Sequence, residues 1–305
     1  PALGYVVENA WLGNSLIQQL HRQQRVELLC PAKVIAAEPR SSGLDLTLEA
    51  EQPRQINARL LVVADGAGSG LREALGVSVA EKSYRQQALI ANVAFARPHE
   101  GCAFERFTDE GPLALLPLPG VTGAEHRSAL VWTLPPAQAE QLQDCDDEEF
   151  LGALQDRFGY RLGRLRQVGE RHTYPLALTE STEQVRHSVV VMGNAAHALH
   201  PVAGQGYNLA MRDVAELARV LDEAIRAGEA PGSLSVLQRY RQRQHNDQSR
   251  TIAMSDLLPG LFMNSDPVLG LARDMALAGL DVMAPLKREF VRYAAGVAAL
   301  GETHG

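Results

Sequence analysis

Glycines and short polar side chains crowd residues 189–221, VVVMGNAAHALHPVAGQGYNLAMRDVAELARVL. An apolar run ends at Gly193-Asn194, and a Gly-Gln-Gly tripeptide at 204–206 stands just before a helical pattern. Glycine lets a ligand approach the backbone closely, and the start of a helix offers unpaired N–H donors and a partial positive charge. The pattern therefore favours a seat for phosphate, or for another group that carries or develops negative charge. A plain strand–loop–helix connection is the alternative.

Three side chains in this segment could do chemistry. Asn194 follows a predicted strand, and ligands of open α/β sheets bind beyond the carboxyl ends of strands, so it is placed to bind a polyol or its own backbone. His197 and His200 have a spacing of three, but no third ligand is evident, and no metal site is predicted. His200 either lines a pocket or packs in the core.

A second glycine turn, ADGAGSGLR at 64–72, follows the apolar run LLVVA. Asp65 either contacts the hydroxyls of a cofactor or sets the turn. Ser69 is placed to cap a short helix. Arg72 is expected to meet either a pyrophosphate or solvent.

The elements that carry these turns can be predicted from apolar patterns. The runs 60–64 and 189–192 are continuously apolar, which suits parallel strands covered on both faces. Four strand-like runs follow one another from residue 84 without an intervening helix, which predicts an antiparallel sheet. The predicted elements are a helix at 11–23, strands at 26–30, 33–38, 44–50, 88–96, 102–108, 112–118 and 128–134, and helices at 137–143 and 147–159.

A long amphipathic helix is predicted after Gly206. Its apolar residues recur in steps of four and three, so they form one stripe that is expected to face the core, with charged residues such as Asp213 and Glu216 on the other faces. The stripe consists of Tyr207, Met211, Val214, Ala218, Leu221 and Ile225.

The order of these elements predicts a mixed α/β (α+β) chain. A three-layer domain with parallel strands would comprise residues 1–80 and 176–230, an antiparallel sheet would be inserted at 81–175, and helices would fill 231–305. The net charge of −7 leaves no basic surface for nucleic acid. No apolar run reaches the roughly 18–20 residues of a membrane span, and no signal-peptide pattern is present. Three widely spaced cysteines predict a cytoplasmic protein with reduced thiols.

Together, ADGAGSGLREALG (64–76) and GNAAHALHPVAGQGYNLAMRDVAELA (193–218) resemble the group A flavoprotein monooxygenases, the aromatic-ring hydroxylases that use FAD. GYVVEN, ALIANVAF, FERFTDEGPLALLPL and YPLAL extend the resemblance to the ubiquinone-biosynthesis hydroxylases of the 2-octaprenyl-6-methoxyphenol hydroxylase type. The resemblance covers residues from about 4 to about 300, and residues 193–213 are its most specific part.

The resemblance implies an enzyme that uses FAD, NAD(P)H and O₂ to hydroxylate a polyprenyl phenol. Asn194, where the family has an acidic residue, would meet the ribityl chain, and Pro201 would lie near the isoalloxazine ring. The pyrimidine end would face the segment from Gly204 to Asn208. The implied cofactor residues are Asp65, Gly66, Asn194, Pro201, Gly204, Gln205, Gly206, Tyr207 and Asn208. No catalytic residue can be chosen from the sequence.

The strand–GxGxxG–helix with which this family begins is not found in the sequence. We therefore expect a chain without roughly the first hundred residues of the family, a length inferred from one missing βαβ unit and the segments after it. The chain alone is expected to be inactive, and its capacity to hold FAD stays open. A non-catalytic lipid-binding or scaffold subunit that retains the fold is the alternative function.

A polyprenyl substrate needs a long apolar slot. The predicted sheet offers Phe107, Leu115, Leu116 and Trp132 as lining residues, with His200 beside them, although each also suits a plain core position. Because such a substrate resides in the bilayer, the apolar segments 256–264 and 266–290 predict peripheral contact with the inner membrane. Packing on the body of the protein, on a second subunit or in a ubiquinone-synthesis complex is the other interpretation.

Overall fold

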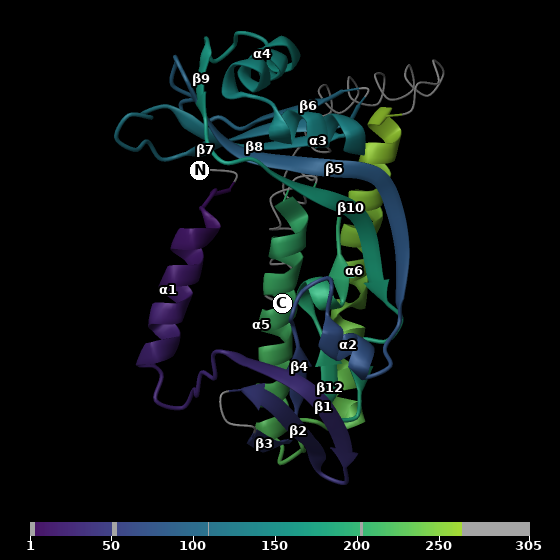
Figure 1. Cartoon of the computed structure of the whole chain (residues 1–305). Helices are drawn as coiled ribbons and strands as arrows, with labels where there is room; N and C mark the ends of the chain where they lie inside the picture. The colour runs from purple at the N-terminus through teal and green to yellow at the C-terminus, as the bar shows by residue number, and fades with distance from the viewer. Residues whose placement is uncertain (1–3, 51–53, 109, 202–203, 264–305) are drawn as a thin grey trace, which may run out of the picture. The chain divides into compact units, whose positions relative to one another are not determined.

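The computed structural model describes residues 4–50, 54–108, 110–201 and 204–263 (Figure 1). These residues form two compact units. The first unit contains residues 4–14, 83–176 and 257–263, and the second contains residues 15–82 and 177–256. The chain divides after residues 14, 82, 176 and 256, so residues 4–14 group with the first unit and residues 231–256 with the second.

An antiparallel sheet forms the centre of the first unit, as the sequence predicts. Its strands run in the order β5-β8-β7-β6, and β9 pairs with the other edge of β5. The helices α3 and α4 pack on one face, where Trp132 meets Phe150 edge to face. The strands are β5 (Val79–Phe95), β6 (Phe104–Phe107), β7 (Pro112–Leu118), β8 (Arg127–Leu134) and β9 (Leu165–Val168), and the helices are α3 (Pro136–Asp144) and α4 (Asp147–Phe158).

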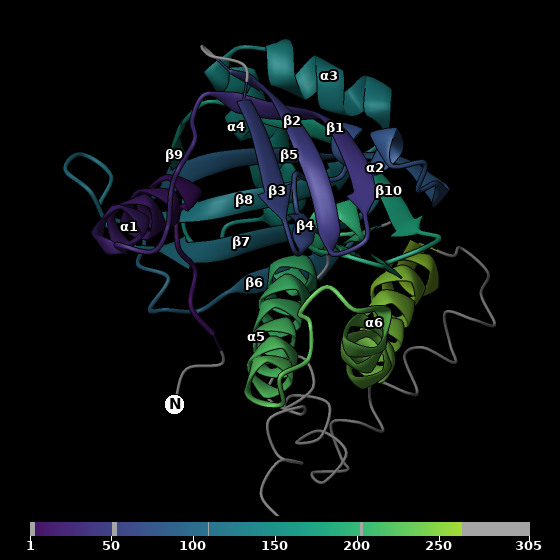
Figure 2. The same cartoon turned by 90° about the horizontal axis from the view of Figure 1, so that it is seen from below.

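The second unit has three layers. Its middle layer pairs β4 (Leu61–Val63) with β12 (Val189–Val191) in parallel, as predicted, and β11 (Val185–Arg186) lies against the other edge of β12. The antiparallel sheet of β1 (Ala32–Arg40), β2 (Gly43–Ala50) and β3 (Arg54–Ala58) covers one face through Leu44, Leu46 and Leu48. Two helices that lie side by side, α5 (Gln205–Arg226) and α6 (Leu234–Met263), contribute to the core on the other face (Figure 2).

The remaining elements are short or lie at the ends of the units. Helix α1 (Asn9–Arg22) has no buried residue. Helix α2 (Gly70–Ala74) and the 3-10 turn η1 (Gly193–Ala195) follow β4 and β12, and β13 (His197–Ala198) pairs with β10 (His172–Ser181). Among the described residues, none of the helices combines the length and the apolar character that a membrane span requires. Most of the predicted membrane-contact segments, including all of 266–290, lies outside the described side chains.

Several local predictions are wrong or incomplete, and strands β9, β10, β11 and β13 were not predicted. The run 26–30 is not a strand, because no strand of the described chain pairs with it, and Val26 and Leu28 are 47% and 50% exposed. Residues 54–58 form a strand that was not predicted, since their apolar content is low. Strand β5 begins at Val79 rather than at residue 88. Its first half is polar and mostly exposed, but it has the same extended strand conformation as the apolar second half.

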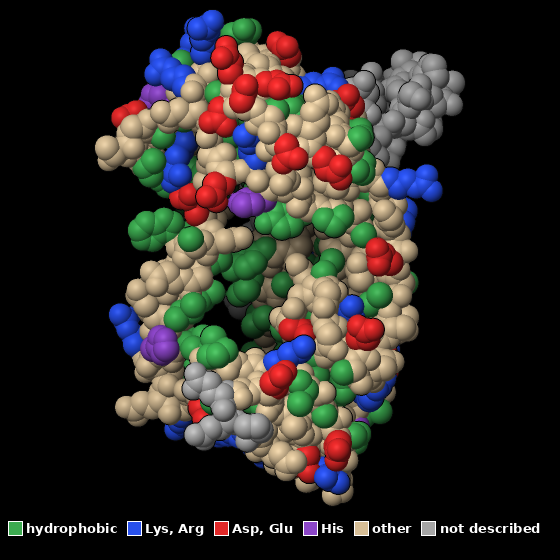
Figure 3. Space-filling model, viewed as in Figure 1, with side chains coloured by type: hydrophobic (Ala, Val, Ile, Leu, Met, Phe, Trp, Pro, Cys, Tyr) green, Lys and Arg blue, Asp and Glu red, His purple; other side chains and the backbone are tan. Residues whose placement is uncertain are grey.

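The predicted core face of α5 is also wrong. Tyr207, Met211, Val214 and Ile225 are between 47% and 62% exposed, and apolar side chains are visible at the surface over α5 (Figure 3). The helix instead turns its adjoining face inward. The buried residues are Leu209, Asp213, Glu216, Leu217, Val220 and Ala224. Periodicity identifies an apolar stripe but cannot say which face β12 and α6 will cover.

We expect the two faces of α5 to respond differently to truncation. Leu217→Ala should lower the free energy of unfolding by about 2–5 kcal/mol, because Leu217 packs among residues of β12 and α6. Val214→Ala should change it by less than about 1 kcal/mol, because Val214 is 48% exposed. Urea titrations followed by circular dichroism measure both values. A loss at Val214 as large as the loss at Leu217 would contradict this assignment of the buried face.

Candidate functional site

The two glycine turns of the sequence lie next to each other in the second unit. Val63 and Val191 are partners in the parallel ladder, and the backbone N–H of Met192 donates to the carbonyl of Val63 at 3.0 Å. Each turn begins two residues beyond its strand, at Asp65 and at Gly193. Both therefore project from the carboxyl edge of the sheet, where ligands of α/β folds bind.

The start of α5 completes this group. Gly204 has a φ of +62°, and no side chain caps the helix at this residue. The first N–H groups of any helix have no acceptor within the helix itself, which is why helix starts can bind ligands. A Cβ atom added at Gly206 would meet no atom within 4 Å, and one added at Gly193 would lie 4.0 Å from the Cβ of Ala210. The helix start is thus open, lined by amides and close to the turn after β12.

Asp65 is engaged with its own turn. The Ser69 hydroxyl donates to its Oδ1, and the backbone N–H of Leu71 lies 3.4 Å from its Oδ2. Ser69 also accepts from the N–H of Arg72 at 3.0 Å, so it caps α2 as predicted. The carboxylate therefore sets the turn, and its residue remains exposed. Contact of Asp65 and Gly66 with a cofactor stays a prediction.

Of the two expectations for Arg72, exposure to solvent is wrong, and contact with a pyrophosphate stays a prediction. Its side chain is buried, and its Nη1 donates to the carbonyl of Ala195 at 2.7 Å. Its Nη2 donates to the carbonyl of Ala67 at 3.0 Å. The expectation of solvent exposure was wrong because two carbonyls that point inward take up the guanidinium. Arg72 thereby ties the first glycine turn to the second.

Sequence reasoning missed a buried group of polar side chains behind the second turn. The Nε2 of His197 lies 3.2 Å from Oδ2 of Asp213, and both residues are at most 2% exposed. Oδ1 of Asp213 accepts from Gln244 and Gln248 at 2.8 and 2.9 Å. The helical period had placed Asp213 on a solvent face. Two glutamines four residues apart on the next helix were the available signal.

His200 packs in the core of the second unit. It is 1% exposed, and its carbonyl accepts from the Ser255 hydroxyl at 3.0 Å. Burial lowers the pKa of its imidazole to about 4, and the nearby Asp256 carboxylate opposes the shift. His200 is therefore neutral at physiological pH. The described residues hold no group of three or more His, Cys, Asp or Glu side chains arranged to bind a metal ion.

The predicted substrate-lining residues of the first unit fall into two groups. Leu115 and Trp132 are at most 1% exposed and belong to the core that α3 and α4 cover. They fill that core, which matches the alternative that these positions are plain core positions rather than the lining of a substrate slot. Phe107 and Leu116 are partly exposed and alternate with these core positions along β6 and β7, so they lie on the other face of the sheet. Contact of these two with a substrate stays a prediction.

Asn194, Tyr207 and Asn208 are exposed, whereas Pro201, Gln205 and Gly206 are partly buried. The carbonyl of Pro201 accepts from the N–H of Gly204 at 3.3 Å. An FAD binding domain family matches residues 37–255, a range that contains both glycine turns and the start of α5.

The chain belongs to this FAD-binding family.

Curated relatives support the assignment. Ubiquinone hydroxylase UbiL of Rhodospirillum rubrum is 39% identical to this family member over 98% of the chain and 68% of the relative. The 3-demethoxyubiquinol 3-hydroxylase of Escherichia coli is 33% identical over 97% of the chain and 74% of the relative. Ubiquinone biosynthesis monooxygenase COQ6 of Homo sapiens is 30% identical over 96% of the chain and 70% of the relative.

A solved structure supports the fold. The p-nitrophenol 4-monooxygenase PnpA of Pseudomonas putida superposes with a TM-score of 0.75 at 19% identity, over 95% of this chain and 73% of that one. The chemistry of the residues at these turns is compatible with FAD. The open position at Gly206 and the uncapped amides around it match the flat, electron-rich edge of a flavin, and Asn194 can both donate and accept.

Acid should destabilise the protein through His200. The pKa of about 4 lies below the ordinary 6.5, so between these values the unfolded chain binds a proton that the native chain does not. The free energy of unfolding should therefore decrease as the pH is lowered from 6.5 to 4, and the loss should reach about 3 kcal/mol at pH 4. In His200→Gln this contribution should vanish. The difference between wild type and variant, measured by urea titration from pH 7.5 to 4.5, isolates it. A difference that does not change with pH would contradict the prediction.

Proposed function

We propose that this protein is an FAD-dependent monooxygenase that hydroxylates the phenol ring of a polyprenylated ubiquinone precursor, using NAD(P)H and O₂. The observation that carries the proposal is the 39% identity to a ubiquinone hydroxylase over 98% of the chain. Two further ubiquinone-biosynthesis enzymes at 33% and 30% identity support the same substrate class.

The cofactor residues belong to the turn after β4, the turn after β12 and the start of α5, and each part would contact a different portion of FAD. The amides from Gly204 to Asn208 would hold the pyrimidine edge of the flavin, and Asn194 would bind the ribityl chain. Pro201 would lie near the ring, while Asp65 and Gly66 would support FAD from the first turn. Bound FAD would supply the redox chemistry, which is hydride acceptance from NAD(P)H and the activation of O₂.

The protein contributes orientation and electrostatics. The first turn of α5, a helix of 22 residues, presents the positive end of its dipole where the flavin edge gains negative charge. Such an interaction stabilises an anion by about 0.3–1 kcal/mol when exposed, and by up to about 2 kcal/mol when partly buried. Phe107 and Leu116 would guide the apolar tail of the substrate along the open face of their sheet.

The substrate also suggests where the enzyme works. A polyprenyl phenol resides in the bilayer, so we propose peripheral contact with the inner membrane through the apolar segments 256–264 and 266–290. Membership of a homo-oligomer or of a ubiquinone-synthesis complex is part of the same proposal.

Gly206→Val should weaken FAD binding at least about tenfold, because the new side chain would occupy the space that the flavin edge needs. The matched control is Gly152→Val, since Gly152 is also a helical glycine whose added Cβ meets no atom within 4 Å. Flavin fluorescence titration of the protein, produced as its gene encodes it, gives the Kd values.

The wild type should also convert a polyprenyl phenol, NAD(P)H and O₂ to a product that mass spectrometry finds heavier by one oxygen atom. A wild type that stays colourless and binds no FAD would overturn the proposal in favour of a non-catalytic lipid-binding or scaffold subunit. If Gly206→Val and Gly152→Val lowered the affinity for FAD equally, the start of α5 would not be part of the cofactor site.

A further inference from the structure

The buried face of α6 in the second unit is largely polar. Tyr240, Gln244, Gln248, Thr251 and Ser255 follow one another in steps of four and three, and each is at most 6% exposed. A polar group that loses water costs free energy unless a hydrogen bond replaces it. The partners of these side chains therefore indicate what the helix was shaped to hold.

Their partners lie around the candidate cofactor site. Gln244 and Gln248 donate to Asp213, and the Ser255 hydroxyl donates to the carbonyl of His200. Thr251 lies 3.3 Å from Nη2 of Arg212. These contacts hold the first half of α5 and the segment that follows β13.

Asp213 connects these residues of α6 to the turn after β12. Its second carboxylate oxygen faces Nε2 of His197 at 3.2 Å, and His197 stands three residues after Asn194. The carboxylate has no exposed surface, so two amides replace water at Oδ1, and the imidazole is the close polar neighbour of Oδ2. We call His197, Asp213, Gln244 and Gln248 the buried polar clamp.

We propose that the buried polar clamp positions the turn at 193–200 against the start of α5, and thereby sets the affinity for FAD. The proposal rests on the proposed function. The turn places only the small side chains of Ala195 and Ala196 in the apolar core, so directional polar contacts contribute to fixing its place. Arg72 secures it on another side through the carbonyl of Ala195. His197 and Asp213 thus act as positioning residues for the cofactor.

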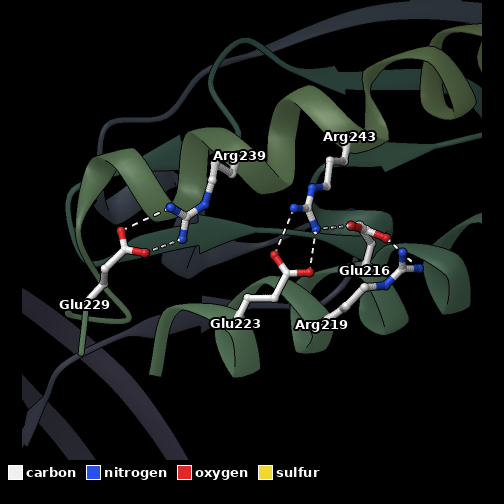
Figure 4. A network of polar contacts seen from close by, with 6 residues as sticks. All are labelled: Glu216, Arg219, Glu223, Glu229, Arg239 and Arg243. Carbon is white, nitrogen blue, oxygen red and sulfur yellow. Dashed lines mark hydrogen bonds and ion pairs between the residues drawn. The ribbon is translucent and has the colours of Figure 1, made fainter. Parts of the chain in front are cut away.

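A second set of contacts between the same helices provides the control. Arg243 of α6 pairs with Glu223 and Glu216 of α5, and Arg239 pairs with Glu229, which follows α5 (Figure 4). Glu216 also pairs with Arg219. This network joins α5 and α6 towards the carboxyl end of α5. Breaking it should lower stability without moving the turn at 193–200.

The experiment compares His197→Leu, His197→Gln and Arg243→Gln with the wild type. In His197→Leu, the Kd for FAD should rise at least about tenfold, because Oδ2 of Asp213 loses the imidazole nitrogen that lies 3.2 Å from it. His197→Gln should restore much of the affinity, since its amide can donate to the same oxygen. Arg243→Gln should leave the Kd within about twofold. Flavin fluorescence titration gives these values.

Hydrogen exchange of the FAD-free protein gives a readout that does not depend on the cofactor. The amides of residues 193–200 and 204–208 should exchange faster in His197→Leu than in the wild type, and no faster in Arg243→Gln. Acceleration spread evenly over the second unit would indicate a merely structural role and would overturn the inference. A Kd for His197→Leu within about twofold of the wild type, or no recovery in His197→Gln, would also overturn it. If the wild type binds no FAD, the proposed function fails, and the exchange data still decide whether the clamp positions the turn.

Discussion

Three residue pairs hold β4 and β12 in parallel register, and the candidate site depends on this pairing. Leu61 with Val189, Val62 with Val190, and Val63 with Val191 bring the ends of two strands together that are about 130 residues apart in sequence. Neither glycine turn would form a site alone, because each supplies only a short polar edge. Paired strands place both turns at one carboxyl edge, and α5 then begins beside them. A shift of register would separate Asp65 from Asn194 and remove the carbonyl of Ala195 from the reach of Arg72.

Polar contacts help to hold the turn between β12 and α5. Its residues are mainly glycine, alanine and histidine, and within it only the small side chains of Ala195 and Ala196 belong to the hydrophobic core. Arg72, Asp213 and Ser255 instead contact it from three different elements. Each contact is buried, so losing one leaves an unsatisfied polar group that costs about 1–3 kcal/mol. Because moving the turn would incur these penalties, its position is well defined, as a cofactor-binding site requires.

The sequence was sufficient to predict the main helices and strands β5 to β8, but not β3, β9 or β10, nor the buried face of α5. Strands β5 to β8 were predictable because turns rich in Gly and Pro separate runs of high β-propensity, and β4 and β12 because they are continuously apolar. The run 26–30 has the same composition, but a strand also needs a partner. Asp213 and Arg72 were missed for a related reason. Charge type indicates solvent only when no neighbouring element supplies donors or carbonyls, and those neighbours come from distant parts of the chain.

Helix α5 shows how the requirements of the site outweigh those of stability. It buries Asp213 and Glu216 while Tyr207, Met211 and Val214 remain about half exposed. For the stability of the second unit alone, burying these two carboxylates is unfavourable, since a buried carboxylate is costly. The observed orientation directs Asp213 towards His197 and towards the glutamines of α6. Because these contacts are directional, they fix the rotation of α5 about its axis and the place of its first turn. The geometry at Gly206 is therefore determined by the buried polar residues, which is why hydropathy alone assigned the wrong face to this helix.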